Sequence, residues 1–224
     1  PEEPKEYTSK KAKDGFLRYT EGPDKGKKVF PDIGESTSID FGNEDRLDMS
    51  YNSSLDCNGT GGFCVYLVTK WNGAQGSYDF LINYCSDSSW DDGWGINYNN
   101  SSAEFRFWVR SWTSTNGTAN GGNRAEIASS GISTSNLNIW KMHYDQNTIT
   151  AQIIGPDADS NTGTYIYSAD VPTNKGPQLN GGHGGFTNYT GRWDIAEVVY
   201  YATPIDSSDQ TITEDYLKER YGLT

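Results

Sequence analysis

The sequence is short of apolar residues, of basic residues and of cysteine, and each shortage excludes a class of protein. Its 224 residues are 34% hydrophobic, and no stretch approaches the roughly 20 apolar residues of a membrane span. Lys and Arg number 18 against 30 Asp and Glu, which gives a formal net charge of −12. Because phosphate binding needs a basic face, we expect no nucleic-acid partner, and we expect no insertion into a membrane.

The three cysteines are Cys57, Cys64 and Cys85. The stretch "CNGTGGFC" places Cys57 and Cys64 across a Gly-rich turn, the spacing of a disulfide at the end of a hairpin. An odd number of cysteines is equally typical of buried thiols in a reducing compartment. The sequence leaves the disulfide and the free thiols as open alternatives.

Aromatic residues are plentiful, with 15 Tyr, 8 Phe and 7 Trp. Disordered chains lack aromatic side chains, whereas strands are enriched in them. From residue 38 onward, short runs of strand-forming residues are separated by turns of Gly, Asn and Asp. This pattern predicts an all-β fold made of two packed antiparallel sheets.

The two ends of the sequence differ from this pattern. Residues 1–28 are rich in Lys and predict a linker or arm with one short strand at "GFLRY", followed by a single domain over 29–224. The chain opens on Pro1, so we expect a processed form or an excised part of a longer protein.

Near the other end, "DQTITEDYLKERY" predicts a helix that closes one end of the sandwich. Its N-cap is predicted to be Ser208, and Gly222 is expected just after its last turn. The predicted apolar face of this helix consists of Ile212, Tyr216 and Leu217.

The stretch "EFRFWVRSW" alternates two kinds of side chain. A two-residue period puts the core residues Phe105, Phe107 and Val109 on one face. The other face alternates guanidinium and indole groups, and "SSWDDGWG" just upstream adds more Trp. Sugar recognition needs flat aromatic rings and planar polar groups, so this face predicts a glycan site, with an anionic glycan as one option. The predicted ligand-binding residues are Arg106, Trp108, Arg110, Trp112, Trp90 and Trp94.

A second interpretation of this face remains open. Loops or the N-terminal arm would cover it, and its Arg side chains would pair with the plentiful Asp and Glu while stacking on Trp. The other three tryptophans, Trp71, Trp140 and Trp193, sit at strand starts beside apolar neighbours and are predicted to be core.

The stretch "PDADSNTG" places Asp157, Asp159 and Asn161 at alternate positions, with Gly163 following. Alternate oxygens can converge on one cation where the chain turns, so these three residues predict a Ca²⁺ site. The twelfth position holds Ser168 where an EF-hand has Glu, and a solvated Asx-rich turn is the alternative.

Residues 180–223 resemble the closing segment of the laminin-G-like domains of the concanavalin A-like superfamily. The resemblance rests on a Gly pair, an aromatic residue, an Ile-Ala-Glu-Val strand ending in Tyr, and a helix ending near Tyr-Gly-Leu. Here these are Gly181, Gly182, Phe186, Gly191, Ile195 to Val198, Tyr200 and Tyr221 to Leu223. Upstream, "GGFCVYLVTKW" and "IWKMHYDQNTITAQIIG" are similar to earlier strands of these domains. The resemblance implies a concanavalin A-like jelly-roll sandwich with a short C-terminal helix, and calcium at a loop rim.

This fold hosts lectins, hydrolases, lyases and structural modules alike, so the residues must choose among them. Hydrolases of the fold resemble one another in a Glu-x-Asp-x-x-Glu strand, which is missing here. Asp194 and Glu197 in "WDIAE" are expected on opposite faces of a strand, with Glu197 hydrogen-bonded near the helix. Arg106, Arg110 and His143 supply the group types of a polysaccharide lyase, although its strand signatures are missing, and His143 is expected to be an ordinary strand residue.

No catalytic residue is therefore predicted. We expect a non-catalytic carbohydrate-binding or adhesion module of a secreted or surface multidomain protein, with a glycan and neighbouring domains as partners. One alternative is a structural or decoration domain of an extracellular assembly such as a virion capsid or tail. The other is a divergent polysaccharide lyase that acts on uronate polymers.

Overall fold

The computed structural model describes residues 9–11, 17–19, 39–40, 47–57, 60–85, 93–110, 124–166, 171, 175–181 and 191–223. The chain forms two compact units, over residues 1–37 and 38–224, where the sequence placed the start of the domain at 29. The first unit holds an antiparallel hairpin of β1 (Ser9–Lys11) and β2 (Leu17–Tyr19), and β2 lies in the "GFLRY" stretch.

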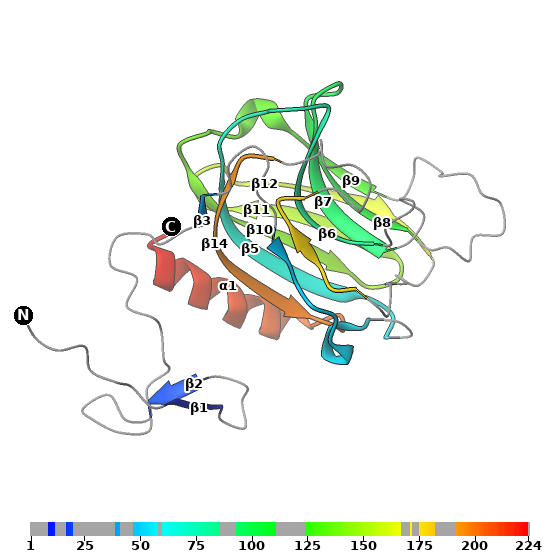
Figure 1. Ribbon diagram of the computed structural model, residues 1–224, viewed down its shortest axis with the longest axis vertical. Helices are drawn as coiled ribbons and strands as arrows, with labels where there is room; N and C mark the ends of the chain where they lie inside the picture. The colour runs from blue at the N-terminus through cyan, green and yellow to red at the C-terminus, as the bar shows by residue number, and fades with distance from the viewer. Residues whose placement is uncertain are drawn as a thin grey trace, which may run out of the picture. The chain divides into compact units, whose positions relative to one another are not determined.

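The second unit is a sandwich of two six-stranded antiparallel sheets, which confirms the predicted all-β class (Figure 1). The strand order of the first sheet is β12-β11-β10-β5-β14-β3, and that of the second is β4-β13-β6-β7-β8-β9. The strands of the first sheet are β3 (Ile39–Asp40), β5 (Phe63–Trp71), β10 (Leu137–Tyr144), β11 (Thr148–Ile154), β12 (Asp159–Thr164) and β14 (Trp193–Tyr201). Those of the second are β4 (Leu47–Asp48), β6 (Tyr78–Tyr84), β7 (Gly93–Asn99), β8 (Glu104–Arg110), β9 (Arg124–Ala128) and β13 (Gln178–Leu179). Two short 3-10 helices, η1 (Ser53–Leu55) and η2 (Ser129–Gly131), lie in connections.

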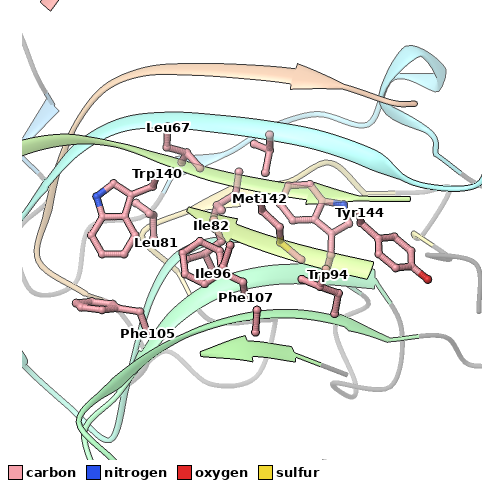
Figure 2. Packing of buried hydrophobic residues seen from close by; sticks show 14 of the residues in the cluster. Leu67, Leu81, Ile82, Trp94, Ile96, Phe105, Phe107, Trp140, Met142 and Tyr144 are labelled. Atoms are coloured by element: carbon pink, nitrogen blue, oxygen red, sulfur yellow. The ribbon is translucent and has the colours of Figure 1, made fainter. Parts of the chain in front are cut away.

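Aromatic side chains fill the space between the two sheets. Figure 2 shows residues of both sheets pointing into this space: Leu67, Trp140, Met142 and Tyr144 from the first sheet and Leu81, Ile82, Trp94, Ile96, Phe105 and Phe107 from the second. The predicted core tryptophans are confirmed, because Trp140 and Trp193 are fully buried and Trp71 is 8% exposed. Phe105, Phe107 and Val109 also face this core, as the alternation in β8 predicted.

The helix α1 (Ser207–Tyr221) covers the outer face of the first sheet (Figure 1). Its N-cap is Asp206, whose carboxylate accepts a hydrogen bond from Asp209 N at 2.9 Å, so the prediction of Ser208 was wrong. Gly222 ends the helix in the left-handed conformation, as predicted. Ile212 is 61% exposed and does not belong to the buried face, since Thr213 and Leu217 are the residues turned toward the sheet.

Polar contacts between α1 and the first sheet supplement this narrow apolar face. Lys141 Nζ lies 2.7 Å from Glu214 Oε1 and 3.3 Å from Gln152 Oε1, and the Lys141 side chain is 6% exposed. A second contact joins the hydroxyls of Tyr201 and Thr213 at 2.9 Å. The position of the helix therefore depends on a buried ion pair as well as on apolar burial.

All three cysteines are free thiols, so the disulfide alternative is wrong. Cys57 packs in the core between the sheets, whereas Cys64 lies on the opposite side of β5, against the face that α1 covers. The two side chains therefore point away from each other. Burial raises the pKa of Cys64 to about 12, which leaves this thiol protonated and unreactive at neutral pH.

The edge strands β12 and β9 lie side by side at one margin of the sandwich. Asn161 Nδ2 donates to Glu126 O at 2.6 Å, and Gly163 lies so close to the backbone of Arg124 that a side chain would not fit. Neither β9 nor β13 was predicted, and β12 lies where a turn or calcium loop was expected. Within the part of the chain described here, no helix is long and apolar enough to cross a membrane.

Candidate functional site

The candidate site is the surface of the second sheet that faces away from the core. Its residues alternate along β6, β7, β8 and β9 with the core residues. Two cross-strand rows make up its centre, one of Phe80, Asn97, Arg106 and Glu126 and one of Asn83, Gly95, Trp108 and Arg124. We call the surface formed by these eight residues the Arg106 face.

Arg106 is held between two carboxylates. Its Nη2 lies 2.6 Å from Glu104 Oε1, its Nε donates to the same oxygen at 2.7 Å, and Nε is 3.6 Å from Glu126 Oε1. Arg124 forms a further ion pair with Glu126. Burial opposes ionisation of Glu104, but hydrogen bonds from Ser102 and Arg106 outweigh it and lower the pKa of Glu104. The result is a partly exposed network of two guanidinium and two carboxylate groups.

Trp108 lies flat against the sheet rather than standing out from it. It is 5% exposed and packs with Phe80 and Cys85. Its ring covers Gly95 on β7, because a Cβ atom at Gly95 would come within 2.6 Å of Trp108 Cζ2. The indole is thus fixed against the sheet, and glycine at position 95 is what makes room for it.

Three asparagines on the same side of the sheet are almost fully buried: Asn83, Asn97 and Asn99. Asn83 Oδ1 accepts from Cys85 Sγ at 3.5 Å, and Asn99 Oδ1 accepts from Ser101 N at 3.0 Å. Asn97 Nδ2 donates to Tyr98 O at 3.1 Å, but its Oδ1 has no hydrogen-bond partner among the described residues. A buried acceptor left in this state costs about 1–3 kcal/mol.

The structure separates the six predicted ligand residues. Arg106 and Trp108 share the Arg106 face, whereas Trp94 is fully buried in the core, stacked on Phe63 at 4.7 Å and on Tyr200 at 5.5 Å. An indole in that position cannot stack on a sugar, so Trp94 leaves the candidate site. Trp90, Trp112 and the side chain of Arg110 lie outside the described residues.

The face also contains residues that were not among the predicted ligand-binding residues. Phe80, Asn97, Arg124 and Glu126 all lie beside Arg106 or Trp108. The two-residue period that separated the faces of β8 also separates those of β7, and it puts Asn97 with Gly95 and Asn99 on the outward side. Among the described residues, Trp108 is buried, whereas the ion-paired side chains of Arg106, Arg124 and Glu126 are 17–34% exposed.

The predicted calcium residues do not converge. Asp159 and Asn161 lie in β12, an extended strand, and the Asp157 carboxylate already accepts hydrogen bonds from Ser133 N, Asn136 Nδ2 and Asn138 Nδ2 at 2.7–3.0 Å. Over the described ranges, no three His, Cys, Asp or Glu side chains are grouped as metal ligands. The arrangement fits a carboxylate that ties two loops together better than a chelating loop, and calcium stays a prediction for a binding measurement.

Asp194 and Glu197 differ from expectation in one respect. A β-bulge between Ile195 and Glu197 shifts the register, so both carboxylates face outward on the first sheet, and the prediction of opposite faces was wrong. Asp194 is bound by Lys70 Nζ at 2.6 Å and Asn72 Nδ2 at 2.7 Å.

Glu197 contacts the C-terminal helix, as predicted. It accepts hydrogen bonds from the hydroxyls of Tyr216 and Tyr221, each at 3.0 Å, and pairs with Arg220 at 3.2 Å. Since Asp194 and Glu197 each have their own partners, they do not resemble the acid and nucleophile of a glycoside hydrolase.

His143 lies far from the Arg106 face in the architecture. It belongs to β10 on the side of the first sheet that α1 covers, and its Nε2 donates to Ile205 O at 3.2 Å. Burial lowers the pKa of His143, which favours a neutral imidazole. Arg106 and His143 thus lie on the two opposite outer faces of the sandwich, and they cannot act on one substrate as a lyase would require.

No family model and no curated protein sequence matches the chain. Three solved structures are similar to it over about three quarters of its length. The binding domain of botulinum neurotoxin DC in complex with SialylT has 12% identity and a TM-score of 0.52, covering 77% of this chain and 40% of that one. The K499G mutant of NanB sialidase from Streptococcus pneumoniae has 15% identity and a TM-score of 0.52, covering 78% and 27%. Trypanosoma rangeli sialidase has 11% identity and a TM-score of 0.53, covering 77% and 26%.

These likenesses concern the fold alone, and the matched part is less than half of each of those chains. Together with the two antiparallel sheets and the C-terminal helix, they confirm the expected two-sheet jelly-roll sandwich as the fold. The function has to be argued from the residues of this chain.

Proposed function

We propose that the chain is a non-catalytic carbohydrate-binding module and that the Arg106 face binds the glycan. The observation that carries the proposal is the network of ion pairs among Arg106, Arg124, Glu104 and Glu126, whose side chains are 17–34% exposed. Guanidinium and carboxylate groups held by one another in a fixed arrangement are the partners that sugar hydroxyls need. The fold neighbours include a binding domain in complex with SialylT, which supports a glycan as the type of ligand.

The charges of this face favour a neutral glycan. Two Arg side chains are matched by two Glu side chains, so a carboxylate or sulfate group would meet as much repulsion as attraction. The net charge of −12 adds a long-range repulsion against polyanions. Hydroxyl groups, which both donate and accept, are the groups that such a balanced network recognises best.

The test is an array of neutral and anionic oligosaccharides probed with the full chain and with Arg106→Ala. Loss of hydrogen bonds from a charged group is worth about 1.5–3 kcal/mol, so the variant should bind at least about 10-fold more weakly. Lys70→Ala is the matched control, because it removes an ion-paired cation from the first sheet and should leave binding unchanged. A wild-type chain that binds no glycan, or an Arg106→Ala chain that binds as well as wild type, contradicts the proposal.

We further propose that this module works in a larger secreted or surface protein, where it serves adhesion. Its mean hydropathy of −0.74 and its acidity support exposure to an aqueous surface. A structural module of an extracellular assembly would instead show no glycan binding and a stable oligomer in sedimentation velocity. That pair of results would replace the carbohydrate-binding function with the structural one.

A further inference from the structure

We propose that Glu104 selects the sugar bound at the Arg106 face: it accepts a hydrogen bond from one of two neighbouring hydroxyl groups, while Arg106 donates to the other. This inference rests on the proposed function of the Arg106 face. It adds Glu104 as a ligand contact and names the group on the ligand that is recognised.

Glu104 is the first residue of β8, and only one of its two carboxylate oxygens is engaged. Oε1 accepts hydrogen bonds from Ser102 Oγ at 2.6 Å and from Arg106 Nε at 2.7 Å, and it lies 2.6 Å from Arg106 Nη2. Among the described residues, no donor forms a hydrogen bond with Oε2. The inner oxygen therefore holds the network together, and the outer one is left for another partner.

The guanidinium group of Arg106 shows the same division. Its Nε and Nη2 face Glu104 and Ser102, whereas Nη1 has no acceptor within hydrogen-bond distance in the part of the chain that the structure describes. Neither Glu104 Oε2 nor Arg106 Nη1 is buried, and the two side chains are 18% and 17% exposed. The network thus presents one free acceptor and one free donor to solvent, on side chains that hold each other in place.

The turn between β7 and β8 fixes this arrangement before a ligand arrives. Ser101 N donates to Asn99 Oδ1 and Ser129 N donates to Ala103 O, each at 3.0 Å. Ala103 has a φ of 53°, a left-handed conformation that is strained for a residue with a Cβ atom. Strained backbone persists where the surrounding contacts enforce it, and it gathers at ligand sites. Groups that are positioned in advance bind a ligand at a lower entropy cost.

The free acceptor and the free donor define the ligand group. A carboxylate oxygen only accepts and a guanidinium only donates, so the ligand must supply a donor and an acceptor side by side. Two hydroxyls on adjacent carbons of a sugar ring do so. A trans amide points its N–H and C=O in opposite directions, so an acetamido group cannot meet both partners. An ionised carboxylate or sulfate has no proton for Glu104 and is repelled by it.

The experiment uses the full chain on an array of neutral oligosaccharides, followed by the single-deoxy analogues of the sugar that binds best. In wild type, removal of either of two adjacent hydroxyls should weaken binding at least about 10-fold, because a charged partner loses its hydrogen bond.

Glu104→Gln is the informative variant, because Gln keeps an oxygen for Ser102 and Arg106 and places an amide nitrogen where Oε2 was. The variant should bind the parent sugar at least about fivefold more weakly, since a charge-assisted hydrogen bond is replaced by a neutral one. Removal of one of the two hydroxyls should then cost Glu104→Gln about fivefold less affinity than it costs wild type, and removal of the other should cost both chains the same. Asp194→Asn is the matched control, because it removes an ion-paired carboxylate from the first sheet and should leave every affinity within about twofold.

The outcomes separate the role of Glu104 from the function on which it rests. If wild type binds a neutral oligosaccharide and Glu104→Gln binds it equally well, the role of Glu104 is overturned while the carbohydrate-binding function stands. If Glu104→Gln weakens the parent sugar and every deoxy analogue by the same factor, Glu104 does not contact the ligand and the inference is also overturned. If wild type binds no neutral oligosaccharide, the proposed function fails and the role of Glu104 fails with it.

Discussion

The ion pair between Lys141 and Glu214 should determine how firmly α1 is held on the first sheet. Glu214→Leu leaves a buried ammonium group with Gln152 Oε1, 3.3 Å away, as its remaining partner. Breaking a buried pair costs about 3–5 kcal/mol, and since the Glu214 side chain is 17% exposed we expect about 3 kcal/mol. At roughly 2–4 °C per kcal/mol for a domain of this size, the melting temperature should fall by about 6–12 °C.

The double variant Lys141→Met with Glu214→Leu makes the test specific to the pair. Apolar replacement of both partners is nearly neutral in buried pairs, so the double variant should recover to within about 1 kcal/mol of wild type. Urea denaturation followed by circular dichroism gives the free energies of unfolding of wild type, the two single variants and the double variant. The expected coupling energy is about 2–3 kcal/mol. Lys70→Met, which breaks a pair whose lysine is 33% exposed, should cost no more than about 1 kcal/mol. If the double variant loses as much free energy of unfolding as the two single variants together, Lys141 and Glu214 do not interact and the ion pair is refuted.

Three further predictions concern the two outer faces and the thiols. Gly95→Ala should destabilise the fold by about 1–3 kcal/mol, because the added methyl group meets Trp108. Gly131→Ala, with open space around it, should change the free energy of unfolding by no more than about 0.5 kcal/mol. Equal melting temperatures for the two variants would show that the indole does not lie against Gly95. Burial lowers the pKa of His143 in the folded chain, so as the pH falls below the ordinary pKa of 6.5 the unfolded chain is protonated before the folded chain. The stability that neutral His143 contributes above pH 6.5 is therefore lost as the pH falls. His143→Gln should therefore lose less stability than wild type between pH 7 and pH 5 in matched urea titrations, and parallel curves would contradict this. A thiol reagent at pH 8 should label none of the three cysteines of the native protein and all three after unfolding, while a single labelled cysteine would indicate a disulfide.

Where one face of a strand is buried, the sequence was sufficient to predict the structure. The alternation in "EFRFWVRSW" predicted both faces of β8, because a period of two leaves no other arrangement once Phe105 and Phe107 are inside. The same rule applied to "GWGINYN" would have placed Trp94 in the core and Asn97 outside. The density of Trp in that segment therefore drew attention to the wrong side of β7.

Elsewhere the structure depends on contacts that no local pattern reveals. The residues of β12, "DSNTGT", have low strand propensity, and they become a strand because β11 supplies backbone partners on one side and β9 lies close by. The bulge before Glu197 inserts one residue and brings Asp194 and Glu197 to the same face, which no spacing rule predicts. The buried face of α1 contains Thr213 where Ile212 was expected, since polar contacts with the sheet set the rotation of the helix.

The outer face of the second sheet is proposed to bind a neutral glycan. Its most direct test is a titration of the isotopically labelled protein with the neutral oligosaccharide that binds best on the array, followed by amide chemical shifts. The largest shifts should cluster on β8 and β9, at and around Arg106 and Glu126, and raising the salt concentration should leave the affinity within about twofold. Shifts that cluster around α1 and the first sheet, or an affinity that falls steeply with salt, would contradict it.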